Sequence, residues 1–275
     1  MRRRGCIVTH SVESLVTRRS FDDISLYGPP LPQGGLADCI RGLWNACKPW
    51  VERIELNRTL RATDPESFLE AFAQAFGTNA TGIACAFIGD GRECRFSTVL
   101  RAVPALLGGY AQQTSVFISG ERHASLGEHL LKSTGVLVDA WFGRYTPEPD
   151  AHLLHLKMHA FVDDPAWSDA GQHYEQLRCA ELPVFSGANL ERWVNPFAPF
   201  ELGWCNYWSS RTAELLQFPN SSSDQKMLGY SEHLENGAWL VKLTPDPLNL
   251  ATEAHIRILA LAYERFAAFG RAWNQ

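Results

Sequence analysis

No stretch of this sequence approaches the roughly 20 consecutive apolar residues that a helix needs to cross a bilayer. The arginines at positions 2–4 are not followed by the uninterrupted apolar segment of an export signal. The seven cysteines are odd in number and irregularly spaced, which is untypical of a secreted disulfide framework and indicates reduced thiols. We therefore expect a soluble cytoplasmic protein.

An excess of positive charge is also missing. The 25 basic and 30 acidic residues leave a formal net charge of -5. Proteins that bind nucleic acid directly carry a basic surface against the phosphates. The sequence thus argues against DNA or RNA as a ligand.

Catalytic and cofactor motifs are absent from the sequence as well. It contains no Gly-x-Ser-x-Gly, no Gly-x-x-x-x-Gly-Lys-Ser/Thr, no His-Glu-x-x-His and no Cys-x-x-Cys. We predict no catalytic residue, no cofactor and a protein that is not an enzyme. The alternative is a small hydrolase-like enzyme in which Glu121 and His123, directly after a predicted strand, act as acid and base.

Three histidines lie close together in residues 152–159. On a helix, His152, His155 and His159 would share a face that suits a metal ion. The alternation of residues 153–162 favours a strand instead, and Lys157 between two of the histidines would repel a cation. We therefore predict a solvated or partner-facing strand and no metal site.

Apolar residues are plentiful, with 45% hydrophobic residues, nine Trp and fifteen Phe. Such a chain can bury a large core, so we expect one domain over residues 1–275. Residues 28–35 are rich in Pro and Gly and are predicted to form a loop. This loop and the N-terminal arm before it occupy residues 1–35.

Periodicity and turn signals predict the remaining elements. Asp64 and Pro65 are typical of a helix start and precede the helix predicted over residues 65–77. Hairpin turns are predicted at Gly89-Asp90-Gly91 and at Asn236-Gly237. The fold class is α/β (α+β), with a mixed, mainly antiparallel sheet and helices packed on its faces. Helices are predicted over residues 36–51, 65–77, 99–107, 126–131, 188–193, 211–217 and 251–269, and strands over 82–88, 93–96, 114–119, 136–145, 153–162, 204–209, 231–234 and 239–244, with a long loop over 181–201.

Aromatic residues gather just before and within the predicted strand of residues 204–209. Trp204 and Trp208 would share one face of that strand and Tyr207 the other, so a single packing layer would bury only one set. We assign Trp204 and Trp208 to the core. Trp193 and Tyr207 are candidates for a partner-binding patch.

Acidic residues flank the two strands predicted over residues 136–145 and 153–162. At loop positions they would present negative charge to a basic partner, although ordinary solvation also explains them. The acidic partner-binding candidates are Glu148, Asp150, Asp163 and Asp164.

The C-terminal third carries distinctive segments, namely LGWCNYWS at 202–209, AELLQFP at 213–219, GAWLVKLT at 237–244, PLNL at 247–250 and AYERF at 262–266. Over residues 200–270 the sequence resembles bacterial immunity proteins of the Imm52 type. These segments are structural, so the resemblance transfers no catalytic residue.

The resemblance implies an antitoxin that binds a secreted toxin, typically a nuclease effector of a type VI or similar secretion system. We expect it to bind the toxin directly and to occlude its active site. A homodimer is compatible with the sequence. An adaptor protein with a non-toxic partner is a further alternative.

Overall fold

The computed structural model describes residues 22–56, 59–77, 80, 82–104, 108–119, 124–148, 150–158, 164–170, 172–183, 195–220, 222–266 and 269. A ten-stranded sheet runs through it in the order β3-β2-β4-β5-β6-β1-β7-β8-β10-β9, and each of its neighbouring pairs is antiparallel. The predicted fold class is therefore confirmed. The strands are β1 (Asp22–Gly28), β2 (Arg53–Leu56), β3 (Leu60–Ala62), β4 (Ile83–Gly89), β5 (Arg92–Ala102), β6 (Tyr110–Ser119), β7 (Phe142–Thr146), β8 (Cys205–Trp208), β9 (Glu232–His233) and β10 (Trp239–Lys242).

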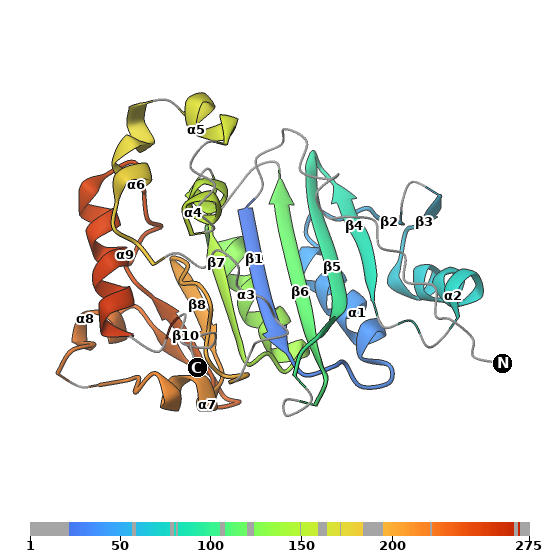
Figure 1. The fold of residues 1–275 in the computed structure, drawn as a ribbon. Coiled ribbons are helices and arrows are strands. Elements are labelled where there is room, and N and C mark those ends of the chain that lie inside the picture. The colour runs from blue at the N-terminus through green and yellow to red at the C-terminus, as the bar shows by residue number, and fades with distance from the viewer. Residues whose placement is uncertain are drawn as a thin grey trace.

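Helices cover the two halves of the sheet differently (Figure 1). Helices α1 and α3 lie behind strands β1, β5 and β6, whereas α7 and α9 lie at the other end of the sheet, around β8 and β10. The helices are α1 (Gly35–Cys47), α2 (Pro65–Phe76), α3 (Ala124–Leu137), α4 (Asp150–Met158), α5 (Pro165–Ala170), α6 (Glu175–Cys179), α7 (Ser210–Leu215), α8 (Gln225–Leu228) and α9 (Glu253–Arg265), with a 3-10 turn η3 (Gln172–Tyr174).

The main core lies between the sheet and α1, α2 and α3. Every second residue of β1, β4, β5 and β6 is buried there, because side chains alternate between the two faces of a strand. The helices contribute apolar stripes of the kind that a 3.6-residue period produces. Fully buried members include Ile24, Leu26, Ile40, Phe68, Phe87, Phe96 and Val116.

Strand β8 is buried on both faces. Tyr207 contacts α3, where a Cβ on Gly135 would come within 2.6 Å of its ring. The Trp208 ring meets Phe218 and Phe266 on the opposite side. Two packing layers therefore enclose this strand, and for that reason both sets of its side chains are buried.

The core assignment of both tryptophans is confirmed, because Trp204 and Trp208 are buried. Their predicted common face is wrong. Trp204 lies just before β8, and its ring contacts Tyr145, which packs against α3 at Gly127.

Several predicted elements are confirmed. Asp64 caps α2, since its carboxylate accepts a hydrogen bond from the Ser67 amide at 2.9 Å. The β4–β5 hairpin turns through Asp90 and Gly91, both with positive φ, as a type I′ turn requires. The β9–β10 hairpin forms, but only Gly237 has positive φ and the loop spans residues 235–237.

Four predictions about elements are wrong. Residues 22–28 of the predicted arm form β1, and β5 extends through Ala102 where a helix was expected. Residues 136–137 belong to α3 and not to a strand. The predicted strand at 153–162 begins as helix α4, whose apolar residues are buried on several sides and so lack a single stripe. The predicted helix at 188–193 lies outside the described residues.

No described helix is long and apolar enough to cross a membrane.

Candidate functional site

Strands β2 to β6 and the first half of β1 leave one face without a covering helix among the described ones. Figure 1 shows this face toward the viewer, with α1 and α3 behind it. We call it the open face. Its side chains are the half-buried or exposed members of each alternating strand pattern, apart from Glu55, which neighbouring arginines cover. They are Asp23, Ser25, Arg53, Glu55, Arg61, Ala84, Ala86, Ile88, Glu93, Arg95, Ser97, Val99, Arg101, Gln113, Ser115, Phe117 and Ser119.

Strand register lines these side chains up in rows across the sheet. Arg61 pairs with Glu55, Glu55 with Ala86, and Ala86 with Arg95. Arg95 in turn lies opposite Phe117. A row of this kind brings residues far apart in sequence within side-chain reach of one another, because paired Cβ atoms lie about 4.5–5.5 Å apart.

Arginine–glutamate pairs hold the charged side chains of the open face. Glu55 accepts a hydrogen bond from Arg53 Nε at 2.7 Å and forms an ion pair with Arg61, whose Nε lies 3.1 Å from the same Oε1. Arg95 Nε lies 2.6 Å from Glu93 Oε1. Each guanidinium group carries five N–H donors, so one arginine can pair with more than one acceptor, as Arg53 does with Glu55 and with Glu52 at 3.9 Å.

The charges of this region balance. Arg53, Arg61, Arg95 and Arg101 are matched by Asp23, Glu55, Glu93 and Glu52, the last of which lies just before β2 with its Oε2 3.9 Å from Arg53 Nη1. Arg101 Nε donates to the neutral Gln113 Oε1 at 2.7 Å. The open face therefore carries charges of both signs, most of them held in ion pairs.

A buried ion cluster bounds the open face on the β7 side. Arg144 is buried, with Nη2 3.0 Å from Asp23 Oδ2 and Nε 2.6 Å from Glu201 Oε2. Burial alone would lower the pKa of Arg144, but Glu201 and Asp23 raise it above its ordinary value. Beside it, Phe200 packs edge-on against Tyr27, whose pKa burial raises. This cluster fixes the segment before β8 on the sheet.

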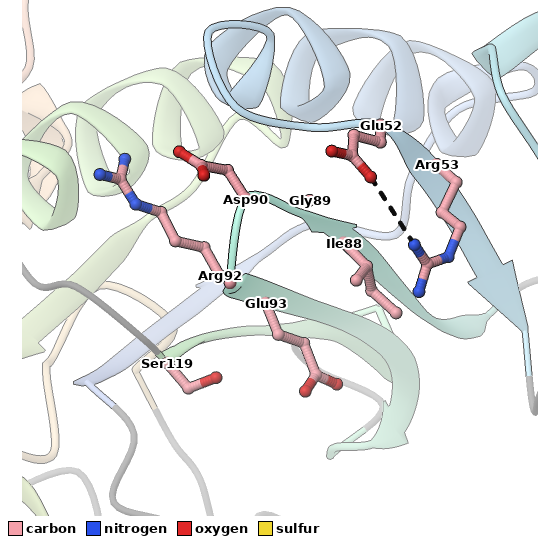
Figure 2. Close-up of a pocket in the computed structure, with 9 residues that line it drawn as sticks. Glu52, Arg53, Ile88, Gly89, Asp90, Arg92, Glu93 and Ser119 are labelled. Atoms are coloured by element: carbon pink, nitrogen blue, oxygen red, sulfur yellow. Dashed lines mark ion pairs between the residues drawn. The ribbon is translucent and has the colours of Figure 1, made fainter.

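A pocket of about 470 Å³ lies at one end of the open face (Figure 2). The cross-strand row Arg53, Ile88, Glu93 and Ser119 forms part of its wall, and the β4–β5 turn completes it. In Figure 2, Ile88 and Glu93 point to one side of the sheet and Arg92 to the other. Guanidinium and carboxylate groups together suit a small polar group or a partner's side chain.

Two of the partner-binding candidates from the sequence lie inside the protein. Asp150 is 4% exposed, and its Oδ2 accepts a hydrogen bond from the Leu250 amide at 2.8 Å. Tyr207 is 1% exposed, and its hydroxyl accepts a hydrogen bond from Asn236 at 3.0 Å. Their contacts are internal, so a partner would reach neither side chain without rearrangement of the fold.

Two further candidates make local contacts with the backbone. Asp164 accepts a hydrogen bond from the Ala166 amide at 2.9 Å at the start of α5. Glu148 is half-buried, and its amide donates to Asp22. The candidates Asp163 and Trp193 lie outside the described residues, as do the alternative acid and base Glu121 and His123.

The histidine segment is helical where it is described. His152 is half-buried and His155 exposed on α4, while His159 lies outside the described residues. Across the described part of the chain, no group of three or more His, Cys, Asp or Glu side chains is arranged to hold a metal ion.

Sequence reasoning missed the open face, although β5 carries a signal for it. From Glu93 to Arg101 the side chain of each odd-numbered residue lies on the open face, and the side chains of Cys94, Phe96 and Thr98 between them are buried. Only residues 93–96 were predicted as a strand, because the spacing of Val99, Val103, Leu106 and Leu107 suggested a helix that is interrupted near Pro104. Register across strands cannot be read from a single strand's pattern.

Comparisons with known proteins bear on the whole fold. The Pseudomonas aeruginosa T6SS protein PA0821 is similar in structure, with a TM-score of 0.50 and 9% identity, over 90% of this chain and 73% of that chain. At this identity the likeness shows a shared fold. Curated proteins give no match. The resemblance to the Imm52 type stays a prediction. A family model matches residues 125–272, more than half of the sequence, and the chain belongs to that family, described as Domain of unknown function (DUF5953).

Proposed function

We propose that this protein is an immunity protein that neutralises a cognate secreted toxin by binding it directly, without catalysis. The toxin belongs to a type VI or related secretion system, and following the sequence resemblance it is a nuclease effector. Two independent lines support this proposal. The C-terminal segments resemble immunity proteins, and the fold is shared with a protein that is named for the T6SS.

The open face is the observation that carries the proposal. It offers ordered charged side chains on strands of a large sheet, and such side chains lose little conformational entropy when a partner binds. Rigid strands also hold a binding surface more firmly than loops do. A protein that silences a toxin needs high affinity, and preorganisation of this kind supplies part of it.

Host survival tests the proposal. The neighbouring gene's product is expressed in a sensitive host with this protein, with an empty vector, or with an unrelated protein of similar size. We expect growth only with this protein. Equal killing in all three strains would exclude an immunity role against that gene product.

The same assay addresses catalysis. An immunity protein that acts by binding protects in proportion to its amount relative to the toxin, whereas an enzyme that inactivates the toxin protects at substoichiometric levels. We expect titration of the toxin near a one-to-one ratio. Protection at a small fraction of that ratio would indicate catalysis instead.

A further inference from the structure

We infer that strand β1 exchanges between two copies of this chain. In the exchanged dimer, β1 of each copy lies between β6 and β7 of the other. Asp23 and Ser25 of the open face then come from the second copy, so two chains complete each open face. Exchange of an identical element is a low-cost route to a dimer, because both copies already carry the strand and its slot. The inference does not depend on the proposed function.

The position of β1 in the sheet permits this exchange. It is the first described strand, yet it lies inside the sheet between β6 and β7. Those two strands are connected to each other through α3 and not through β1. Without β1, each of them would present a row of backbone N–H and C=O groups that only another strand can pair. The slot between β6 and β7 therefore accepts a strand, and a second copy offers the same one.

Side chains on both sides recognise β1. The Tyr145 hydroxyl donates to Asp22 Oδ2 at 3.0 Å, and Arg144 Nη2 lies 3.0 Å from Asp23 Oδ2. The core side of the strand is fully buried at Ile24 and Leu26. Because a second copy carries the same residues, these contacts are the same within one chain and between two chains. The hinge that joins β1 to α1 therefore decides between monomer and dimer.

The composition of this hinge, residues 29–34, favours exchange. Pro29, Pro30 and Pro32 fix φ and restrict the residue before each of them to extended conformations, so the segment prefers an extended path. In the closed monomer the chain instead turns back, with the Gly35 amide donating to the Pro32 carbonyl at 2.9 Å and φ of 85° at Gly34. Figure 1 shows α1 returning behind the sheet after this turn. An extended hinge carries β1 away from its own sheet and toward another copy.

Protein concentration during folding sets how much dimer forms. A short flexible connection holds a chain's own strand at an effective concentration in the millimolar range, on the order of 1 mM. A stiff hinge that prefers to extend lowers this value. Exchange therefore competes when the chain folds at about 1 mM and not in dilute solution. Once folded, the dimer persists on dilution, because β1 must leave the sheet before the copies can separate.

Cross-linking between differently labelled chains tests the exchange. Ser25 on β1 pairs with Ser115 on β6, and Ser115 pairs with Ser97 on β5, so the three serines form one row on the open face. An S25C chain and an S115C chain are mixed in denaturant and refolded together at about 1 mM. Both carry serine in place of Cys6 and of the exposed Cys179. We expect a disulfide-linked heterodimer after mild oxidation. The matched control, S25C with S97C, should give none, because β6 separates β1 from β5.

Proline substitution in the hinge tests the cause. Wild-type protein refolded at about 1 mM should contain a dimer in size-exclusion chromatography with light scattering, and protein refolded in dilute solution should not. We expect P29A/P30A/P32A to lower the dimer fraction several-fold, because the hinge then turns back more readily. The control P245A/P247A changes prolines in the loop before α9 and should leave the fraction at the wild-type level. Circular dichroism melts check that each variant is folded.

Each outcome decides the inference. A wild-type monomer at every refolding concentration would overturn it. A dimer without the S25C–S115C link would overturn it as well, because β1 would then remain in its own sheet. A dimer fraction unchanged in P29A/P30A/P32A would remove the hinge as the cause. The immunity function is tested separately by host survival, so it stands or falls independently of these results.

Discussion

At the residue scale, two glycines of α3 set how closely this helix approaches the sheet. A Cβ on Gly127 would lie 2.1 Å from the Tyr145 ring, and one on Gly135 would lie 2.6 Å from the Tyr207 ring. Both rings are buried, and the Tyr145 hydroxyl also donates to Asp22 at 3.0 Å. These glycines are required for close packing and not for backbone freedom.

We predict that G127A and G135A each lower the free energy of unfolding by about 1–3 kcal/mol, the usual cost of overpacking a core. Urea denaturation followed by tryptophan fluorescence measures the change. G229A is the control, because the nearest atom to its Cβ is 3.4 Å away. Wild-type stability in G127A would show that the ring of Tyr145 can move aside.

Asp150 makes stability depend on pH. Burial raises the pKa of this carboxyl above its ordinary value, although hydrogen bonds from Leu250 and Tyr174 oppose the shift. A raised folded-state pKa means that the folded protein holds the proton more tightly than the unfolded chain. The resulting stability is present below the unfolded pKa of 3.8 and is lost as pH rises through the folded pKa.

We therefore predict that D150N is more stable than the wild type at neutral pH, and that the difference shrinks as pH falls toward 4. Asn keeps an acceptor for the Leu250 amide and carries no charge. Urea midpoints at several pH values provide the measurement, with the exposed D246N as control. A difference that grows toward low pH would contradict the assigned direction.

At the element scale, a buried carboxylate joins the C-terminal end of α9 to the segment before α8. Asp224 is fully buried and accepts from Arg265 Nε and Nη2, each at 2.8 Å. It also accepts from the Asn220 amide at 2.7 Å. Arg265 reaches the Gln217 carbonyl in addition, so one pair connects α7, α8 and α9.

We predict that D224A lowers the free energy of unfolding by about 3 kcal/mol, because it leaves a partly buried guanidinium without its carboxylate. Thermal and urea unfolding measure this loss. The neighbouring S223A removes a hydroxyl that hydrogen-bonds to Asp224 and Arg265 but leaves the ion pair in place, and it should cost about 1 kcal/mol or less. Equal effects of the two substitutions would mean that the ion pair does not hold these elements together.

Elements with one apolar stripe or a clear cap could be predicted from the sequence, and others could not. Helix α2 has the Asp64 cap and a stripe ending at Gly77, and both are observed. Helix α4 was not predicted, because Leu153, Leu154 and Leu156 are all buried and its apolar residues do not lie on a single face. Strand β1 was also not predicted, and the structure places it inside the sheet, between β6 and β7.

At the scale of the whole molecule, the described helices cover both faces of the sheet at its β8 end and one face at its β4–β6 end. The sequence predicts helices on a mainly antiparallel sheet, but cannot say which face stays open, since that depends on strand order. The predicted binding residues, including Asp150 and Tyr207, were chosen by residue type and local position. Whether a side chain is buried depends on contacts with residues far away in the sequence, and such contacts bury both Asp150 and Tyr207.

The central claim is that this protein acts by forming a stable complex with a toxin. The most direct test mixes it with an inactive form of the neighbouring gene's product and measures the mass by size-exclusion chromatography with light scattering. The account predicts one peak with the mass of a stoichiometric complex. Two separate peaks at micromolar concentration, together with no protection of the host, would contradict it.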